Sequence, residues 1–134
     1  MIIGIGTDIV QIPRIEKILE VHSTTFFDKY FSKEEFAKYK NIDSSNIKLL
    51  ACKYAKFFAA KESFVKALGT GFRFGINLKD IQILSDDLGK PYIKLNNTTK
   101  EYVENNFGKN LHFYLSLSDD YPTAIAFVTI EKED

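Results

Sequence analysis

The stretch IKLLACKYAKFFAAKESFVKAL, residues 47–68, decides the fold of this chain. It contains no glycine or proline, and Gly69 follows it, so the stretch predicts one long helix that ends at Leu68. Apolar side chains form one broad face of this helix and also extend beyond it around much of the circumference. A helix of this kind has to be covered on several sides. We therefore expect it to lie at the centre of the domain or beneath a partner subunit.

The segments around the long helix predict a single α+β domain over residues 1–134, with helices packed on a mostly antiparallel sheet. Residues 1–7, which lead up to Asp8, are rich in isoleucine and glycine and predict a buried strand or the start of one. Pro13 suits the first turn of a helix. Beyond the long helix, alternating apolar residues predict four strands, at 81–83, 91–95, 111–117 and 123–130.

Two capping-box patterns predict short additional helices. Ser32 with Glu35 predicts a helix over about residues 33–39, and Thr98 with Glu101 predicts one that reaches about residue 105. The polar run NIDSSN, residues 41–46, predicts a loop that is too short to separate two domains.

The composition of the chain excludes several classes of protein. Its 134 residues are 45% hydrophobic with a formal net charge of zero, which is typical of a globular domain and lacks the strong basic field of nucleic-acid-binding proteins. Cys52 is the only cysteine, so no intramolecular disulfide can form. The N-terminus lacks the basic start of a signal peptide, and no apolar stretch approaches the roughly 20 residues of a membrane helix. We therefore expect a cytoplasmic protein with no membrane or nucleic-acid partner.

The first candidate for chemistry is the segment GIGTD, residues 4–8. Its two glycines suggest a dinucleotide-binding loop, but the third glycine of that motif is missing and almost no strand precedes the first. The carboxylate of Asp8, just past a strand, is the feature that remains. Taken alone, an ordinary turn aspartate is the more frequent explanation.

The second candidate is Lys61-Glu62 together with Lys66. Glu62 and Lys66 are four residues apart on the long helix and so share a face. An ordinary surface ion pair has the same spacing, and spacing alone favours it. Phosphoryl transfer would use the same residue types, because a carboxylate is a ligand for Mg²⁺ and an ammonium neutralises charge on a leaving phosphate.

The third candidate is the run Gly69-Thr70-Gly71, directly after the helix. Glycines let backbone N–H groups approach a phosphate closely, although a helix end followed by a loop is the commoner meaning of such a run. The run lacks the Gly-Lys-Ser/Thr ending of a Walker A loop, and its helix precedes it.

In combination and order, these segments resemble the holo-acyl-carrier-protein synthase family of 4′-phosphopantetheinyl transferases. The resemblance lies in the N-terminal signature of residues 4–10 with Arg14, in the second signature of residues 58–67 that runs into 69–71, in the Gly89-Lys90-Pro91 turn, and in Ser116-Leu117-Ser118. The second signature is the specific one.

The resemblance implies a reaction in which coenzyme A and an apo-acyl carrier protein give the holo-carrier and 3′,5′-ADP, for fatty acid biosynthesis. Asp8 and Glu62 resemble the family's Mg²⁺ ligands, and Lys66 the residue that stabilises the leaving group. Glu62 or a metal-held water would be the base. The residues implied at the nucleotide are Lys66, Gly69, Thr70, Gly71, Ser118 and Asp119.

The resemblance also implies partners. Arg14, with Lys17 nearby, resembles the basic helix that docks the acidic carrier protein. Short members of this family are homotrimers with active sites at subunit junctions, which would explain the apolar breadth of the long helix.

Two departures from the family pattern concern the nucleotide. Asp119 stands where many relatives have histidine, and a carboxylate there would repel a phosphate. Lys56 and Phe57 stand where many relatives carry arginine next to phenylalanine. Either the chain turns differently at Asp119, or a nearby lysine compensates, or coenzyme A binds more weakly. Asp119 also leaves open a binding module without activity, which the intact Asp8 and Glu62 oppose; a purely structural domain is the third alternative.

Overall fold

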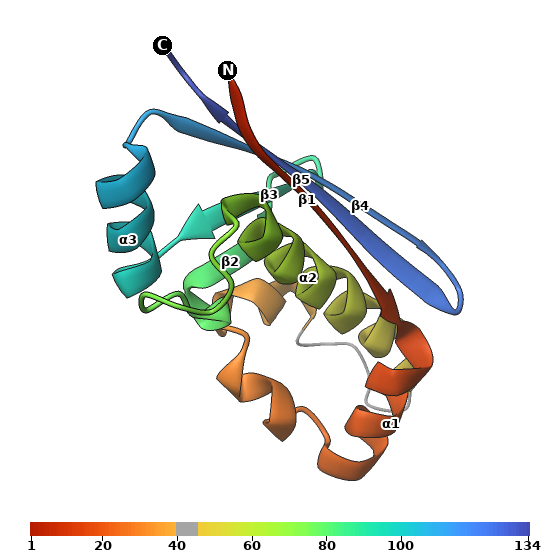
Figure 1. Cartoon of the computed structure of the whole chain (residues 1–134). Helices are drawn as coiled ribbons and strands as arrows, with labels where there is room; N and C mark the ends of the chain where they lie inside the picture. Colours follow the sequence, from red (N-terminus) through yellow and green to blue (C-terminus); the bar gives the residue numbers. More distant parts are fainter. Residues whose placement is uncertain (40–45) are drawn as a thin grey trace.

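The computed structural model describes residues 1–39 and 46–134, and helix α2, Ile47–Leu68, runs through its centre (Figure 1). Its bounds are those that the sequence predicts. The Asn46 side chain accepts a hydrogen bond from the Leu49 amide at the start of the helix. At its end, Gly69 adopts a left-handed conformation with φ 76°, and its amide donates to the Val65 and Lys66 carbonyls. Of the two expected positions for this helix, the centre of the domain is confirmed.

The strands form two antiparallel sheets. The larger has the order β1-β5-β4, with β1 at Ile2–Gln11, β4 at Leu111–Asp120 and β5 at Thr123–Lys132. The smaller is a hairpin of β2, Ile81–Ser85, and β3, Pro91–Leu95. Figure 1 shows α2 lying across one face of the larger sheet. The predicted α+β class is confirmed, and the strands divide into two sheets because β3 turns into helix α3 instead of joining β4.

Short elements surround α2 and form the walls beside it. They are α1 at Ile12–His22, the 3₁₀ turns η1 at Thr25–Lys29, η2 at Glu34–Tyr39 and η3 at Leu78–Asp80, and α3 at Asn97–Phe107. Within residues 1–39 and 46–134, no helix is long and apolar enough to cross a membrane.

The two capping-box predictions have different outcomes. Glu35 accepts a hydrogen bond from the Ser32 amide as expected, but the element that follows is a 3₁₀ turn. The predicted cap at Thr98 is wrong, because α3 begins at Asn97 and the Thr98 hydroxyl donates to the Gly75 carbonyl. The predicted polar loop at 41–46 lies outside the described residues apart from Asn46.

Strand β1 packs directly on α2, and two glycines make this possible. A Cβ atom on Gly4 would collide with the Ala67 carbonyl oxygen, and one on Gly6 with that of Ser63. Residues 1–7 form the start of a longer strand, which is one of the two predicted alternatives, and the expected burial of this strand is wrong. The strand continues to Gln11, and its outer face is open, with Ile5 62% and Ile9 61% exposed.

Candidate active site

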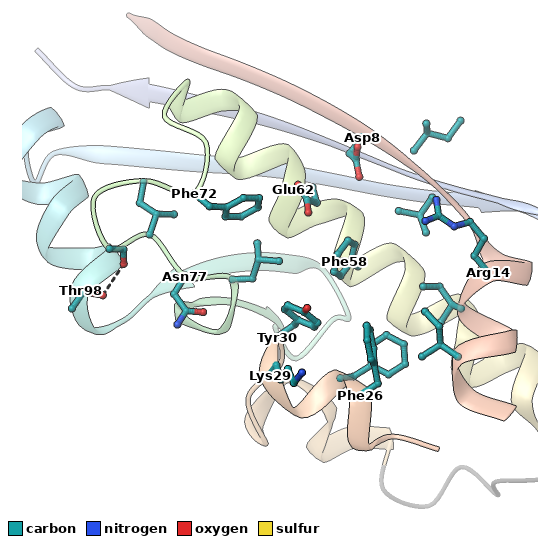
Figure 2. Close-up of a pocket in the computed structure, with 18 residues that line it drawn as sticks. Asp8, Arg14, Phe26, Lys29, Tyr30, Phe58, Glu62, Phe72, Asn77 and Thr98 are labelled. Carbon is teal, nitrogen blue, oxygen red and sulfur yellow. Dashed lines mark hydrogen bonds between the residues drawn. The ribbon is translucent and has the colours of Figure 1, made fainter. Parts of the chain in front are cut away.

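Asp8 and Glu62 line one cleft of about 940 Å³, at the place where β1 crosses α2 (Figure 2). Side chains alternate along a strand, so Asp8 lies on the same face of β1 as Gly4 and Gly6, the face that packs on α2. The close packing allowed by the glycines therefore brings the Asp8 carboxylate to Glu62 on the helix. Asp8 lies within the strand and not in the turn that the sequence suggested.

Lys66 lies beside this pair of carboxylates. Its Nζ lies 3.0 Å from Asp8 Oδ1 and donates to the Thr7 carbonyl at 3.0 Å. Asp8 and Lys66 are 58 residues apart in sequence, so the fold has brought the two signatures together. The i,i+4 spacing of Glu62 and Lys66 thus belongs to a three-residue cluster instead of an isolated surface pair.

The Asp8–Glu62 pair could hold a hard cation. Burial and the neighbouring charge of Asp8 raise the pKa of Glu62, and the Lys66 ammonium opposes this effect. Two nearby carboxylates disfavour each other's ionised forms, and a bound cation removes that cost. Mg²⁺ binds through one or two carboxylates plus phosphate and water, so a pair is sufficient. Among the described residues, no three or more His, Cys, Asp or Glu side chains group together in a way that could hold a metal ion.

The walls of the cleft come from α1, η1 and the loop after α2. Arg14 lines the cleft from α1 and Lys29 from η1, so two cations face it (Figure 2). Lys17 is exposed on α1 and does not line the cleft. Several lining side chains are mainly apolar and received no role from the sequence; they are Phe26, Tyr30, Phe58, Phe72 and Leu78.

The glycine-rich loop supplies one of these missed residues. Gly69 and Gly71 both have positive φ, and the space around each is open. Glycine is therefore favoured at these two positions by the backbone conformation and not by close packing. Arg73 Nε donates to the carbonyl of the buried Thr70 at 3.0 Å. The chain then brings Phe72, 55% exposed, to the cleft near Glu62. An aromatic residue in a glycine-rich loop beside a catalytic helix was the signal that could have found it.

Ser118 and Asp119 lie away from this cleft. Asp119 Oδ1 is 3.0 Å from Lys56 Nζ on α2, and hydrogen bonds from Lys56 and Cys52 lower the pKa of Asp119. Of the three explanations for Asp119, the structure supports a compensating lysine. Lys56 also lines a second hollow of about 310 Å³, together with Lys53, Ser85, Gly89 and Ser116 among others. The predicted nucleotide residues are thus divided between two places on one chain.

Lys61, which the sequence grouped with Glu62, has a different role. Its side chain is fully buried, and its Nζ lies 2.8 Å from Glu35 Oε1. It points away from the cleft, into the packing between α2 and β2.

The comparisons with known proteins agree with this geometry. A family model described as the 4′-phosphopantetheinyl transferase superfamily matches residues 4–126. The chain belongs to this superfamily.

Individual members of the superfamily match over nearly the whole chain. The holo-[acyl-carrier-protein] synthase of Wolbachia pipientis subsp. Culex pipiens is 47% identical over 97% of this chain and 98% of its own. The Plasmodium yoelii acyl carrier protein synthase with ADP bound has a TM-score of 0.85 at 33% identity, covering 100% of this chain and 98% of its own. A holo-(acyl-carrier-protein) synthase from Bacillus anthracis, in complex with CoA (3′,5′-ADP), has a TM-score of 0.75 at 30% identity, covering 99% of both chains.

Proposed function

We propose that this phosphopantetheinyl transferase moves the 4′-phosphopantetheine arm of coenzyme A onto a serine of an apo-acyl carrier protein, releasing 3′,5′-ADP. The observation that carries the proposal is the meeting of Asp8, Glu62 and Lys66 beside one cleft. The three side chains come from the two signatures of the sequence, and relatives of matching fold are named for this reaction. The single domain of residues 1–134 would carry the whole activity.

Magnesium fits the residues present. Asp8 and Glu62 would hold Mg²⁺, which would neutralise negative charge on the pyrophosphate of coenzyme A. Lys66 is already beside Asp8 and is half-exposed, so its ammonium can turn towards a phosphate. There it stabilises the negative charge that develops on the departing 3′,5′-ADP.

The attacking serine has to lose a proton as its oxygen bonds to the β-phosphate. Glu62, or a water held at its carboxylate, takes this proton.

An acidic carrier protein would dock on the cation-bearing side of the cleft. Arg14 on α1 and Lys29 on η1 both line it, and Lys17 extends the basic surface along the exposed side of α1. Opposite charges across such a surface steer association and fix the orientation of the partner. The carrier's serine would then enter beside Glu62.

A homotrimer with sites at the subunit junctions agrees with two features of the single chain. The outer face of the larger sheet exposes apolar side chains, chiefly those of Ile5, Ile9, Ile125 and Phe127. Ser118 pairs with Ile125 in register on this face, so covering it with a second copy would bring Ser118 towards a neighbouring site. Gly69–Gly71 and Asp119 would complete the nucleotide site there. Work in the cytoplasm, for fatty acid biosynthesis, follows from the proposed substrates.

The test is a direct assay of the carrier. Purified protein, apo-acyl carrier protein, coenzyme A and Mg²⁺ are incubated, and the carrier is weighed by intact-mass spectrometry with an EDTA control. A phosphopantetheine-sized gain that EDTA prevents would support both the reaction and its metal. No gain, with a known synthase active on the same carrier, would favour a binding module instead.

A further inference from the structure

Lys61 makes an unusual set of bonds for a lysine next to a catalytic glutamate. Its side chain is fully buried, and its Nζ donates three hydrogen bonds of 2.8 Å, to Glu35 Oε1 and to the carbonyls of Leu78 and Ile81. An ammonium group has three donors, so all of them are used. The three acceptors belong to three different elements: η2, which precedes α2 in the chain, and η3 and β2, which follow it.

Glu35 is saturated in the same way. Its Oε1 also accepts from the Ser32 amide at 2.9 Å, and its Oε2 accepts from the Ile83 amide at 3.1 Å. Burial lowers the pKa of Lys61 to about 8 and raises the pKa of Glu35, in each case against the attraction of the partner. Buried ion pairs of this kind are often no more stable than apolar residues of similar volume. Stability is therefore a poor explanation for the pair, and the geometry that it imposes is a better one.

That geometry reaches both walls of the cleft. Leu78, whose carbonyl is bound by Lys61, lines the cleft together with Ile76 and Asn77. On the other side, Glu35 and Ser32 hold the chain that continues directly from η1, where Lys29 and Tyr30 line the cleft. Both walls are thus fastened to α2 one residue before Glu62.

We propose that Lys61 is a positioning residue: its bonds to the Leu78 and Ile81 carbonyls set where the cleft wall stands relative to Glu62. The inference rests on the proposed function, because the wall matters only if substrate is held in the cleft. The lysine itself does not touch the cleft, and it acts through the backbone that it binds. Lys61 should therefore affect the rate of phosphopantetheine transfer as well as the stability of the fold.

Three variants separate positioning from stability, with the thermal midpoint and kcat/KM measured for each. In Glu35→Gln, Lys61 keeps both carbonyl acceptors, so the midpoint falls while kcat/KM stays within about threefold of the wild type. Lys61→Met strands a buried carboxylate and loses both properties. The double variant combines Glu35→Gln with Lys61→Met, so no buried charge is left unpaired and the thermal midpoint recovers. Nothing then binds the carbonyls of Leu78 and Ile81. Its kcat/KM should stay about tenfold or more below the wild type.

Lys79→Met, an exposed lysine on η3, is the matched control and should change neither property. The proposal is overturned if kcat/KM simply follows the thermal midpoint, with the double variant regaining both. If the double variant does not fold, transfer by Glu35→Gln is measured at a temperature below its thermal midpoint. Retained transfer supports the proposal, and lost transfer overturns it. A wild-type protein that makes no holo-carrier would instead refute the proposed function, so the two failures are distinguishable.

Discussion

Lys56 and Asp119 form an ion pair, with Nζ 3.0 Å from Oδ1, that joins α2 to the end of β4. The resemblance on which the site prediction rests implies other residue types at both positions. One departure therefore compensates the other, because the carboxylate that would repel a phosphate has its counter-charge in the same chain. The pair also occupies a lysine that a free phosphate could otherwise bind.

Replacing Asp119 should therefore strengthen the interaction with coenzyme A. In Asp119→Asn, the side chain keeps its size and loses the charge that holds Lys56, so the KM for coenzyme A should fall by about threefold to tenfold. The pair is partly exposed, so the free energy of unfolding should change by less than about 1 kcal/mol. Steady-state kinetics with the neighbouring Asp120→Asn as control provide the measurement. A higher KM would show that Asp119 itself contributes to binding.

Removing either acidic residue of the cleft should abolish transfer and leave the fold intact. Asp8→Ala and Glu62→Ala each delete one of two carboxylates available to a cation, so we expect a loss in kcat/KM of about a thousandfold or more. Intact-mass assays of the carrier measure activity, and circular dichroism measures folding. Asp87→Ala, an exposed residue in the β2–β3 turn, is the control. Wild-type rates in either cleft variant would eliminate the metal assignment.

Local signals in the sequence made Asp8 and Glu62 candidates, and the resemblance to the family joined them into one predicted site. A long helix without glycine or proline sets the face that carries Glu62 and Lys66, and the spacing of Gly4, Gly6 and Asp8 along a strand sets the other side. What the sequence could not reveal is that close packing places the strand on the helix, because the carbonyl oxygens that require glycine belong to residues far along the chain.

Lys61 is a residue whose environment the local sequence did not predict. Beside Glu62 it has the pattern of a charged helix surface, and its partner Glu35 lies 26 residues earlier in a segment predicted only from its cap. Burial of a lysine depends on acceptors supplied by tertiary structure, and no local pattern encodes them. The cleft walls at Lys29, Phe72 and Leu78 were missed for the same reason.

Reversing the charge of Arg14 should weaken binding of the carrier protein much more than binding of coenzyme A. Arg14 lines the cleft and is not hydrogen-bonded to Asp8 or Glu62 in the contacts observed, so Arg14→Glu should raise the KM for the carrier about tenfold or more. The KM for coenzyme A should change far less. Lys29→Glu should act in the same direction. Lys109→Glu, between α3 and β4 and outside the lining of the cleft, should leave both KM values unchanged. An unchanged carrier KM would remove Arg14 from the docking surface.

The packing of β1 on α2 predicts a stability effect at Gly6. In Gly6→Ala, the new Cβ meets the Ser63 carbonyl oxygen, and neither backbone can yield without moving Asp8 away from Glu62. We expect a loss of about 2–3 kcal/mol in the free energy of unfolding, measured by urea titration, together with lower activity. Gly71→Ala, where the space is open and only the positive φ is strained, should cost about 1 kcal/mol. Equal costs would contradict close packing as the reason for Gly6.

The aromatic cluster beside the cleft predicts a loss of stability at high pH. Tyr54 packs against Phe27 and Phe36, and burial, together with the charges of Asp28 and Glu35, raises the pKa of Tyr54 to about 12. In the unfolded chain a tyrosine ionises near pH 10, so the unfolded state is favoured as the pH rises from about 10 to 12.

The stabilisation from neutral Tyr54 is fully present below pH 10, and about 1 kcal/mol of it is lost by pH 11. Urea midpoints measured at pH 7 and pH 11 should therefore fall further for the wild type than for Tyr54→Phe, which has no proton to lose. The comparison within each variant removes the fixed cost of the lost hydroxyl and the ionisation of the other tyrosines. Equal losses in the two proteins would show that Tyr54 ionises in the folded chain as readily as in the unfolded one.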